Sequence, residues 1–262
     1  MEVVLTIAGS DTSGGAGIQA DLKTFEAFGV FGTTVLTVLT AQNTKGVSAV
    51  SEVPSEFIRE QLKSVFDDFD VKAVKIGMLF SNGIINTVRE FVKDLKIPII
   101  FDPVCVSKAG SKLLNDDAIE NLKSIFPYAT IITPNQYEAA LLLGYEFANT
   151  DSLQNIFNLP CKVVVKNHKL EINGSFKSVD TLYKGRDKKT FETPYLESSN
   201  FHGTGCSYSS AIAANIALGK SIEEAIDEAK KFVYFSIKNA PNIGHGSGPI
   251  AHKIGGEICK IK

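Results

Sequence analysis

Short apolar runs alternate with stretches of helical periodicity along most of the chain. Runs such as VVLTIA at 3–8 and TTVLTVLT at 33–40 are rich in β-branched residues, which is typical of strands. Between the runs, apolar residues recur every three or four positions, which predicts helices. The further strands expected are 73–76, 97–101, 130–133 and 162–166. The helices expected are 18–28, 54–66, 84–95, 116–125 and 136–143.

Repeated alternation of strand and helix predicts an α/β fold with a mainly parallel sheet covered on both faces. Between 171 and 194 the pattern changes to short alternating runs with turns at Gly174 and Gly185, which predicts antiparallel hairpins at the sheet edge. Ser221 and Glu224 form a capping-box pattern that begins a C-terminal helix. No linker or internal repeat interrupts the chain, so we expect one domain over residues 1–262.

The polar motifs share one position, because each follows a predicted strand. In a parallel sheet, ligands bind beyond the carboxyl ends of the strands. We therefore expect these motifs to meet at one edge of the sheet. In chain order they are 9–11, 41–44, 77–78, Asp102, 133–135 and Lys166.

Composition narrows the classes of function. The formal net charge is −2, and no basic face suggests nucleic acid as a partner. No apolar run approaches the roughly 18–20 residues that span a membrane, and the first residues lack the basic region of a signal peptide. The four cysteines are widely spaced, which fits neither a disulfide framework nor a zinc site. Reduced thiols predict a cytoplasmic protein.

Residues 201–219 carry the most informative motif, a Gly-Thr-Gly-Cys loop that runs into an alanine-rich helix. Helix N-termini offer unpaired N–H groups and partial positive charge, and Gly203 and Gly205 would let a phosphate approach the backbone. The same field favours the thiolate of Cys206, a suitable base for a small-molecule kinase. The alternative is an ordinary tight turn followed by a small core cysteine.

The glycine-rich segment 9–17 matches neither the phosphate-loop motif nor the dinucleotide fingerprint. We interpret it as a loop that covers a substrate, in which glycines leave room for a small ring. Asp11 or Asp21 would supply a carboxylate. The alternative for Asp21 is an exposed position on the following helix.

Three other motifs have two interpretations each. Asn135 and Glu138 are spaced to bind Mg²⁺, or to form an N-terminal capping box. Lys166 ends an apolar strand, where it would meet phosphate oxygens or extend into solvent. Asp102 would hold metal-bound water or form a turn before Pro103. The histidines are weaker signals, although His245 lies in a glycine-rich loop that could wrap a nucleotide.

Together the motifs resemble the hydroxymethylpyrimidine/phosphomethylpyrimidine kinases, thiamine-biosynthesis enzymes of the ribokinase-like superfamily. The segments that carry the resemblance occur in order over nearly the whole chain: LTIAGSDTSGGAGIQADLKTF, TAQNTKGV, KIGML, ITPNxxEA, HGTGC and GxGP. The resemblance implies a three-layer αβα fold, usually a homodimer, that uses ATP and Mg²⁺. It also implies phosphorylation of 4-amino-5-hydroxymethyl-2-methylpyrimidine and then of the monophosphate to the diphosphate.

The resemblance also implies roles for individual residues. The positions that match the pyrimidine pocket are Gly9, Asp21, Gln42, Met78 and Val104. Gly203, Thr204 and Gly205 match the anion hole, and Cys206 matches the catalytic base. Asp102, Asn135 and Glu138 match the Mg²⁺–phosphate region, and Lys166 matches the phosphate-contacting lysine. An amide such as Gln42 can satisfy both the donor and the acceptor of an aminopyrimidine edge.

The chain departs from the family pattern near the expected nucleotide. The family usually has Lys-Gly-Gly-His after the sixth strand, whereas this chain has Lys166-Asn167-His168. The segment 150–160 is shorter than the usual helix, and His245 stands where relatives often have lysine. These changes affect the expected ATP site more than the expected pyrimidine pocket.

Three other functions are alternatives. A pyridoxine/pyridoxal kinase of the same superfamily is the nearest, since a thiol such as Cys206 adds reversibly to an aldehyde, but Gln42 favours the aminopyrimidine. A catalytically silent binder of a nucleotide or vitamin precursor is the second. The presence of Asp102, Glu138, Lys166 and Cys206 together argues against it. A dinucleotide-dependent oxidoreductase fails because the first loop lacks the fingerprint.

Overall fold

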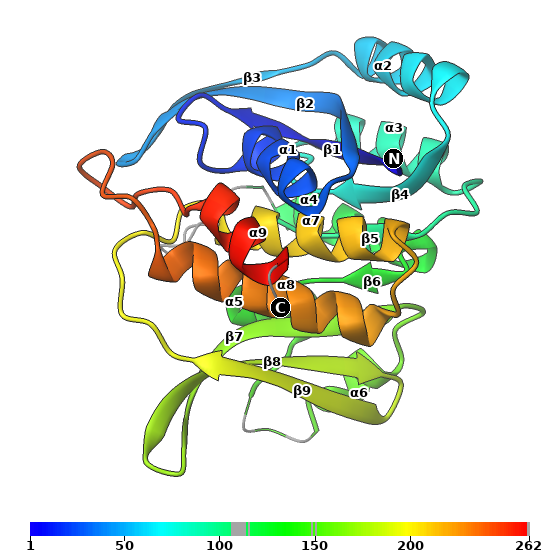
Figure 1. Ribbon diagram of the computed structural model, residues 1–262. Coiled ribbons are helices and arrows are strands. Elements are labelled where there is room, and N and C mark those ends of the chain that lie inside the picture. Colours follow the sequence, from blue (N-terminus) through cyan, green and yellow to red (C-terminus); the bar gives the residue numbers. More distant parts are fainter. Residues whose placement is uncertain (106–113, 115, 148, 150, 261–262) are drawn as a thin grey trace.

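A continuous β-sheet runs through the molecule from edge to edge (Figure 1). The computed structural model describes residues 1–105, 114, 116–147, 149 and 151–260. Within them nine strands lie in the order β3-β2-β1-β4-β5-β6-β7-β8-β9. The strands are β1 (Val3–Asp11), β2 (Phe31–Asn43), β3 (Gly46–Glu52), β4 (Val71–Ile76), β5 (Ile99–Phe101), β6 (Ile131–Ile132), β7 (Lys162–Ile172), β8 (Ser175–Lys184) and β9 (Asp187–Pro194).

Helices cover both faces of the sheet and create two separate hydrophobic cores. The helices are α1 (Gly17–Phe28), α2 (Ser55–Asp68), α3 (Asn82–Val92), α4 (Asp116–Leu122), the 3₁₀ helix η1 (Lys123–Tyr128), α5 (Gln136–Leu143), α6 (Leu153–Phe157), α7 (Thr204–Ala217), α8 (Ile222–Lys238) and α9 (His252–Lys260). One core joins α2 to α6 with one face of the sheet, and the other joins α1, α7 and α8 with the opposite face. The three-layer αβα architecture is therefore confirmed (Figure 1).

The strand order places the ligand-binding edge. Strands β2, β1, β4, β5, β6 and β7 pair in parallel, so their carboxyl ends lie at one edge. From β1 the chain first extends the sheet through β2 and then reverses direction through β4. Open parallel sheets bind ligands at such a switch point. Asp11 is the last residue of β1, and Met78 lies in the segment that follows β4.

The edges of the sheet are antiparallel. At one edge β8 and β9 pair antiparallel with β7, as the pattern of 171–194 predicts. The other edge was not predicted. There β3 pairs antiparallel with β2 in a hairpin, and this hairpin includes residues 41–44, which we expected to follow the strand. Every residue of β3 is exposed, so apolar burial gave it no sequence signature. In addition, β1 extends to Asp11 and takes up the first part of the expected glycine-rich loop.

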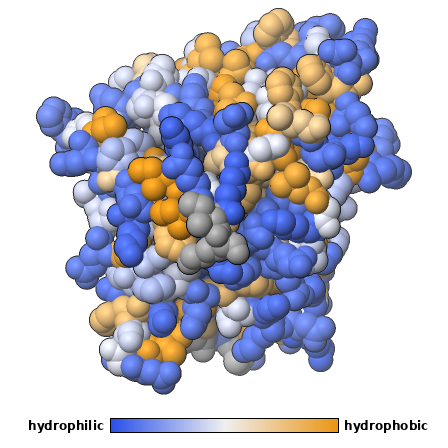
Figure 2. Space-filling model, in the orientation of Figure 1, coloured by the Kyte–Doolittle hydropathy of each residue, from blue (hydrophilic) through white to orange (hydrophobic). Residues whose placement is uncertain are grey.

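Figure 2 shows apolar side chains gathered toward the part of this face where β2, β3 and α2 lie. The exposed apolar residues of these elements are Phe31, Leu39, Val47, Val50 and Phe57.

No helix in the described part of the chain combines the length and apolarity that crossing a bilayer requires.

Candidate active site

Two helix N-termini meet at the Gly-Thr-Gly-Cys motif. Gly203 is the N-cap of α7 and has φ of 81°, a conformation that favours glycine. A Cβ atom built on Gly203 would lie 1.7 Å from the carbonyl oxygen of Gly15, in the loop before α1. Only glycine therefore allows this close approach. The loops that begin α1 and α7 pack against each other, although they are far apart in sequence.

The first turn of α7 presents unpaired backbone donors. The amide of Thr204 bonds to the carbonyl of Phe201, and the amide of Ser207 bonds to that of Gly203. Within the described residues, the amides of Gly205 and Cys206 have no acceptor. Two adjacent N–H groups at a helix N-terminus form a site for an anion. These donors are the groups that the predicted anion hole would use, and anion binding here stays a prediction.

A buried ion pair lies directly beside these donors. The Nζ atom of Lys166 is 2.7 Å from Oδ1 of Asp102, and both side chains are almost fully buried. Thr133 donates to the same oxygen at 3.0 Å. A Cβ on Gly205 would lie 3.4 Å from Lys166 Nζ, so the ammonium borders the first turn of α7. The structure thus brings together one cation and two free N–H groups, as phosphoryl transfer requires.

Asn135 and Glu138 form the capping box that was the alternative to metal binding. Oδ1 of Asn135 accepts from the amide of Glu138 at 3.0 Å, and Oε2 of Glu138 accepts from the amide of Asn135 at 2.8 Å. Burial raises the pKa of Glu138, and Lys166 opposes this effect. Among the described residues, no three His, Cys, Asp or Glu side chains gather as a metal site. A magnesium ion here would depend on phosphate oxygens and water for most of its ligands.

On the other side of the α7 N-terminus, three polar side chains from distant segments meet. His202 Nε2 lies 2.7 Å from Asp11 Oδ2 and 3.3 Å from the amide of Gln42. Asp11 also accepts from the amides of Ser13 and Ala16. Burial alone would raise the pKa of Asp11, but hydrogen bonds from His202 and Ser13 outweigh it and hold the pKa well below its usual range. The Asp11 carboxylate therefore holds the loop before α1 in place through these hydrogen bonds.

The hydrogen-bond network fixes the orientation of the Gln42 amide. Oγ1 of Thr40 donates to the carbonyl of Ser10 at 2.8 Å and lies 3.1 Å from the amide oxygen of Gln42. The amide nitrogen of Gln42 lies 3.3 Å from Nε2 of His202. One N–H and one lone pair remain for a ligand. An aminopyrimidine edge needs this combination.

The expectation that Cys206 is readily ionised is wrong. The helix N-terminus does favour a thiolate, but burial raises the pKa of Cys206 to about 11. Lys75 lowers it, whereas Asp21 and Asp102 raise it further. Burial therefore outweighs the helix field, and at neutral pH Cys206 is a thiol.

The expectation for Asp21 in the pyrimidine pocket needs correction. Asp21 is neither an exposed helix residue nor open to a ligand: its fully buried carboxylate accepts from Lys75, Thr6 and Ser210. A Cβ on Gly9 would lie 2.7 Å from a methyl carbon of Val38, so the small size of Gly9 serves packing between strands. The contact of Gly9 with a substrate stays a prediction.

Met78 and Val104 remain partly exposed at the predicted edge. Met78 follows β4, and its carbonyl accepts from Thr37 at 2.8 Å. Val104 follows β5, and its amide bonds to the carbonyl of Asp102. Both lie beyond strand ends, where the pattern places a ligand. Their contact with a substrate stays a prediction.

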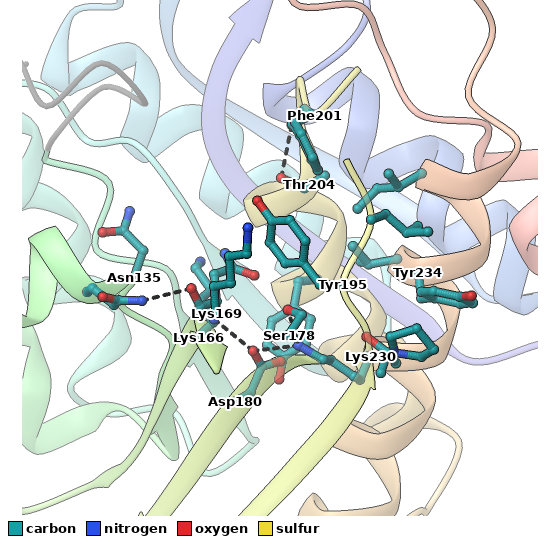
Figure 3. A pocket seen from close by; sticks show the side chains of 18 of the residues that line it. Asn135, Lys166, Lys169, Ser178, Asp180, Tyr195, Phe201, Thr204, Lys230 and Tyr234 are labelled. Carbon is teal, nitrogen blue, oxygen red and sulfur yellow. Dashed lines mark hydrogen bonds and ion pairs between the residues drawn. The ribbon is translucent and has the colours of Figure 1, made fainter. Parts of the chain in front are cut away.

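A cavity of about 400 Å³ extends from the α7 N-terminus along β8 and β9 (Figure 3). Its size is within the range of small-molecule sites. Asn135, Lys166 and Thr204 line one end. The residues that line its apolar part are Tyr195, Leu196, Phe201, Val233, Tyr234 and Ile237. The cavity therefore joins a cationic end near the anion hole to an apolar end suited to a flat ring.

Lys169 adds a second cation to this cavity and was missed in the sequence. Its Nζ lies 4.5 Å from the ring centre of Phe176 and 4.3 Å from that of Tyr195. Figure 3 shows it beside Lys166 and the ring of Tyr195. No carboxylate pairs with Lys169 among the described residues. The rings thus hold an ammonium that is available to an anion.

The departures from the family pattern have structural consequences. Asn167 has φ of 70°, so it adopts the left-handed conformation for which the family usually has glycine. Its amide donates to Asp180, and its carbonyl accepts from Gln136. The segment 150–160 contains only the short helix α6 among its described residues, as its length suggested.

The expectation for His245 is not supported. Its segment packs on the β2–β3 hairpin, where the amide of His245 approaches Thr44 Oγ1 at 3.2 Å. His245 is exposed and does not line the cavity that holds Lys166. The loop covers the Gln42 side of the site rather than the cavity side. Contacts with the β2–β3 hairpin determine the position of this loop, and its glycine-rich sequence does not predict that position.

The fold and the site define a phosphotransferase of the ribokinase-like class. A family model described as phosphomethylpyrimidine kinase matches residues 11–251, and the chain belongs to that family. A hydroxymethylpyrimidine/phosphomethylpyrimidine kinase from Aquifex aeolicus is 41% identical over 93% of this chain and 97% of its own length. A thiamine biosynthesis bifunctional protein from Geobacter sulfurreducens is also 41% identical, over 97% of this chain, which spans about half of that relative (53%).

Solved structures agree with this assignment. The ADP complex of Bacillus subtilis pyridoxal kinase has a TM-score of 0.84 and 34% identity, covering 97% of this chain and 98% of that one. A phosphomethylpyrimidine kinase from Clostridium difficile 630 has a TM-score of 0.76 and 40% identity, covering 89% and 98%. The ribokinase-like fold and the kinase class are therefore confirmed.

Proposed function

We propose that the protein phosphorylates 4-amino-5-hydroxymethyl-2-methylpyrimidine and then its monophosphate, with ATP as the phosphoryl donor. The observation that carries the proposal is the position of the α7 N-terminus. On one side it meets the cavity of Lys166 and Lys169, and on the other it meets Gln42 and His202. A phosphoryl group between the two sides would face the free amides of Gly205 and Cys206. The anion hole then stabilises charge on the transferring group.

In the first reaction, the hydroxymethyl oxygen bonds to the γ-phosphorus while the bond from that phosphorus to the β–γ bridging oxygen breaks. Little covalent help is needed, so positioning and charge stabilisation dominate. The hydroxyl proton must leave, and Cys206 is the base that the family pattern assigns. In the second reaction, the nucleophile is a phosphate oxygen that is already ionised and has no proton to lose.

ATP fits the cavity by chemistry as well as by size. Lys166 and Lys169 meet the phosphates, and the apolar end meets the adenine ring. The carboxylates of Asp102 and Glu138 would hold Mg²⁺ through water, since Asp102 pairs with Lys166 and Glu138 takes part in the capping box. Asn135 lines the same end of the cavity. His245 is left out of this proposal.

Pyridoxal kinase activity is the second candidate, because pyridoxal kinases are among the structural neighbours. A Staphylococcus aureus structure described as a pyridoxal kinase in complex with pyridoxal has a TM-score of 0.85 and 33% identity. Cys206 is partly exposed as a residue, and a thiol adds reversibly to an aldehyde. The donor and acceptor left on Gln42 match an aminopyrimidine better.

We also propose that the chain is one domain that acts as a homodimer in the cytoplasm. The exposed strand β3 has an unpaired edge, and Val47, Val50 and Leu39 are exposed on its hairpin. A second copy of the chain would cover these groups. All four cysteines lie in the described residues and none forms a disulfide, which suits a reducing compartment. Val47→Lys should shift the sedimentation coefficient to that of a monomer.

An assay that offers the hydroxymethylpyrimidine and pyridoxal separately, with ATP and Mg²⁺, tests the proposed function. We expect kcat/KM for the pyrimidine to exceed that for pyridoxal at least tenfold, because only the pyrimidine uses both halves of Gln42. A higher kcat/KM for pyridoxal would overturn the assignment. ATP binding with no turnover of either compound would indicate a silent binder.

A further inference from the structure

A fully buried ion pair lies beneath the candidate active site and has no role in the reaction described above. Lys75 in β4 places its Nζ 2.8 Å from Oδ2 and 3.0 Å from Oδ1 of Asp21 in α1. Thr6 donates to Oδ2 at 2.6 Å, and Ser210 donates to Oδ1 at 2.7 Å. Neither charged side chain is exposed. The pair therefore cannot touch a ligand.

Such a pair is a poor source of stability. Removing two charges from water costs several kcal/mol for each, and well-packed apolar residues often replace buried ion pairs without loss. The pair also constrains its surroundings, since a Cβ on Gly77 would lie 2.8 Å from Lys75 Nζ. Stability alone does not account for it, so its position relative to the reactive groups becomes informative.

Two contacts between α1 and α7 fix the position of the Lys75–Asp21 pair relative to Cys206. The amide of Gly17, at the start of α1, donates to the sulfur of Cys206. One turn further along each helix, Ser210 donates to Asp21. Residues four apart lie on one face of a helix, so both contacts join the same two faces. Asp21 and its partner Lys75 thus lie one turn below the thiol.

Several charges face Cys206 from the elements packed around it. Lys75 comes from β4, Asp21 from α1 and Asp102 from the segment after β5. Lys166 of β7 also interacts with the thiol. The ammonium of Lys75 favours the thiolate and lowers the pKa of Cys206, after burial the largest influence on it, while the two carboxylates raise it. Lys75 and Asp21 therefore shift the pKa of Cys206 in opposite directions.

We propose that Lys75 and Asp21 are positioning residues for Cys206, whose opposed charges set the reactivity of the thiol while their hydrogen bonds fix α7 against α1 and β4. Asp21 lowers the reactivity of the Cys206 thiol, and Lys75 raises it. This role rests on the proposed function insofar as Cys206 acts as the base. It concerns residues that no ligand contacts.

The test follows alkylation of Cys206 by iodoacetamide against pH, with the modified peptide quantified by mass spectrometry to separate it from the other cysteines. Iodoacetamide reacts with the thiolate. At a fixed pH below the thiol pKa, we expect Lys75→Met to slow alkylation about tenfold, and Asp21→Asn to speed it about tenfold, since a tenfold change corresponds to one pKa unit. Thr24→Val is the matched control, because it removes a buried hydroxyl of α1 that donates to the carbonyl of Ala20 and not to Asp21, and it should leave the profile within about twofold of the native one.

Shifts in the same direction, or no shift in either variant, would show that the pair is only structural. Circular dichroism verifies folding, and Lys75→Gln or Asp21→Ser replaces a variant that does not fold. Because alkylation needs no substrate, this readout is separate from the proposed function. Opposite shifts in a protein that fails to phosphorylate the pyrimidine would keep the positioning role and reject the substrate.

Discussion

The side chain of His202 lies 2.7 Å from Asp11, although the two residues are 191 positions apart in sequence. This contact joins the loop before α1 to the loop before α7. The carboxylate of Asp11 is almost fully buried and has donors on both oxygens. The approach of the two loops, on which the anion hole depends, is therefore held by one charged group.

Asp11→Asn should destabilise the protein at neutral pH by about 1–3 kcal/mol, because hydrogen bonds to a charged acceptor are lost. The folded-state pKa of Asp11 lies below the ordinary value of 3.8, so its contribution is present above that value and is lost as the pH falls below it. Urea unfolding at several pH values measures the effect. A difference between native and variant proteins that stays constant from pH 7 to pH 2.5 would contradict it.

Cys206→Ala should fold and bind ligands, but it should affect the two phosphorylations unequally. The first nucleophile is an alcohol that must lose a proton, so we expect a loss in kcat of about 10²–10⁴. The second nucleophile is an ionised phosphate, and we expect a loss below about tenfold on the same reasoning. Separate assays with the alcohol and the monophosphate measure both. Cys161→Ala, which removes a thiol that lies outside the candidate site, is the control. Unchanged turnover of the alcohol would remove the base role.

The pH dependence of the first reaction follows from the thiol. Burial raises the pKa of Cys206 to about 11, so the thiolate fraction increases from pH 7 to pH 10. The rate constant for the alcohol should increase over this range. Cys206→Asp should flatten the profile, since a carboxylate is already ionised there. Stopped-flow measurements under single-turnover conditions provide the test, and a flat native profile would contradict the assignment.

Gln42→Leu should weaken the pyrimidine much more than ATP. The variant loses the donor and the acceptor that remain after Gln42 has bonded to Thr40 and His202. We expect the dissociation constant of the pyrimidine to rise about 10–100-fold, the range for an unpaired polar group. Calorimetry with each ligand separates the effects. Equal losses for both ligands would place Gln42 outside the pyrimidine site.

Lys169→Met should raise the dissociation constant of ATP by about 5–10-fold, because one charge-assisted contact to phosphate is lost. Adenosine has no phosphate, and its binding should stay unchanged. Lys188→Met removes a lysine of β9 that does not line the cavity and serves as the control. A parallel loss of adenosine binding would mean that Lys169 supports the aromatic wall instead.

Local chemistry explains why much of the site could be predicted. Gly203 requires a left-handed turn, and the capping boxes at Asn135 and Ser221 are formed by residues three apart. Such features depend on neighbours in sequence. Helix α9 is the opposite case, because Gly255 and Gly256 make its helical pattern weak. A Cβ on Gly255 would lie 2.0 Å from Ser236 Oγ, and one on Gly256 would lie 2.7 Å from Ala27 Cβ, so these glycines allow α9 to pack closely against α8 and α1.

By itself the sequence determined the alternation of strands and helices, the edge of the sheet where the polar motifs lie and the left-handed turn at Gly203, since each follows from periodicity or local backbone conformation. Only the tertiary structure decided that Asp21 is buried against Lys75, that Asp11 binds His202 and that Cys206 is a neutral thiol at neutral pH. These outcomes depend on desolvation and on charges brought together from distant segments. No local pattern records how much water the packed chain excludes from a given side chain.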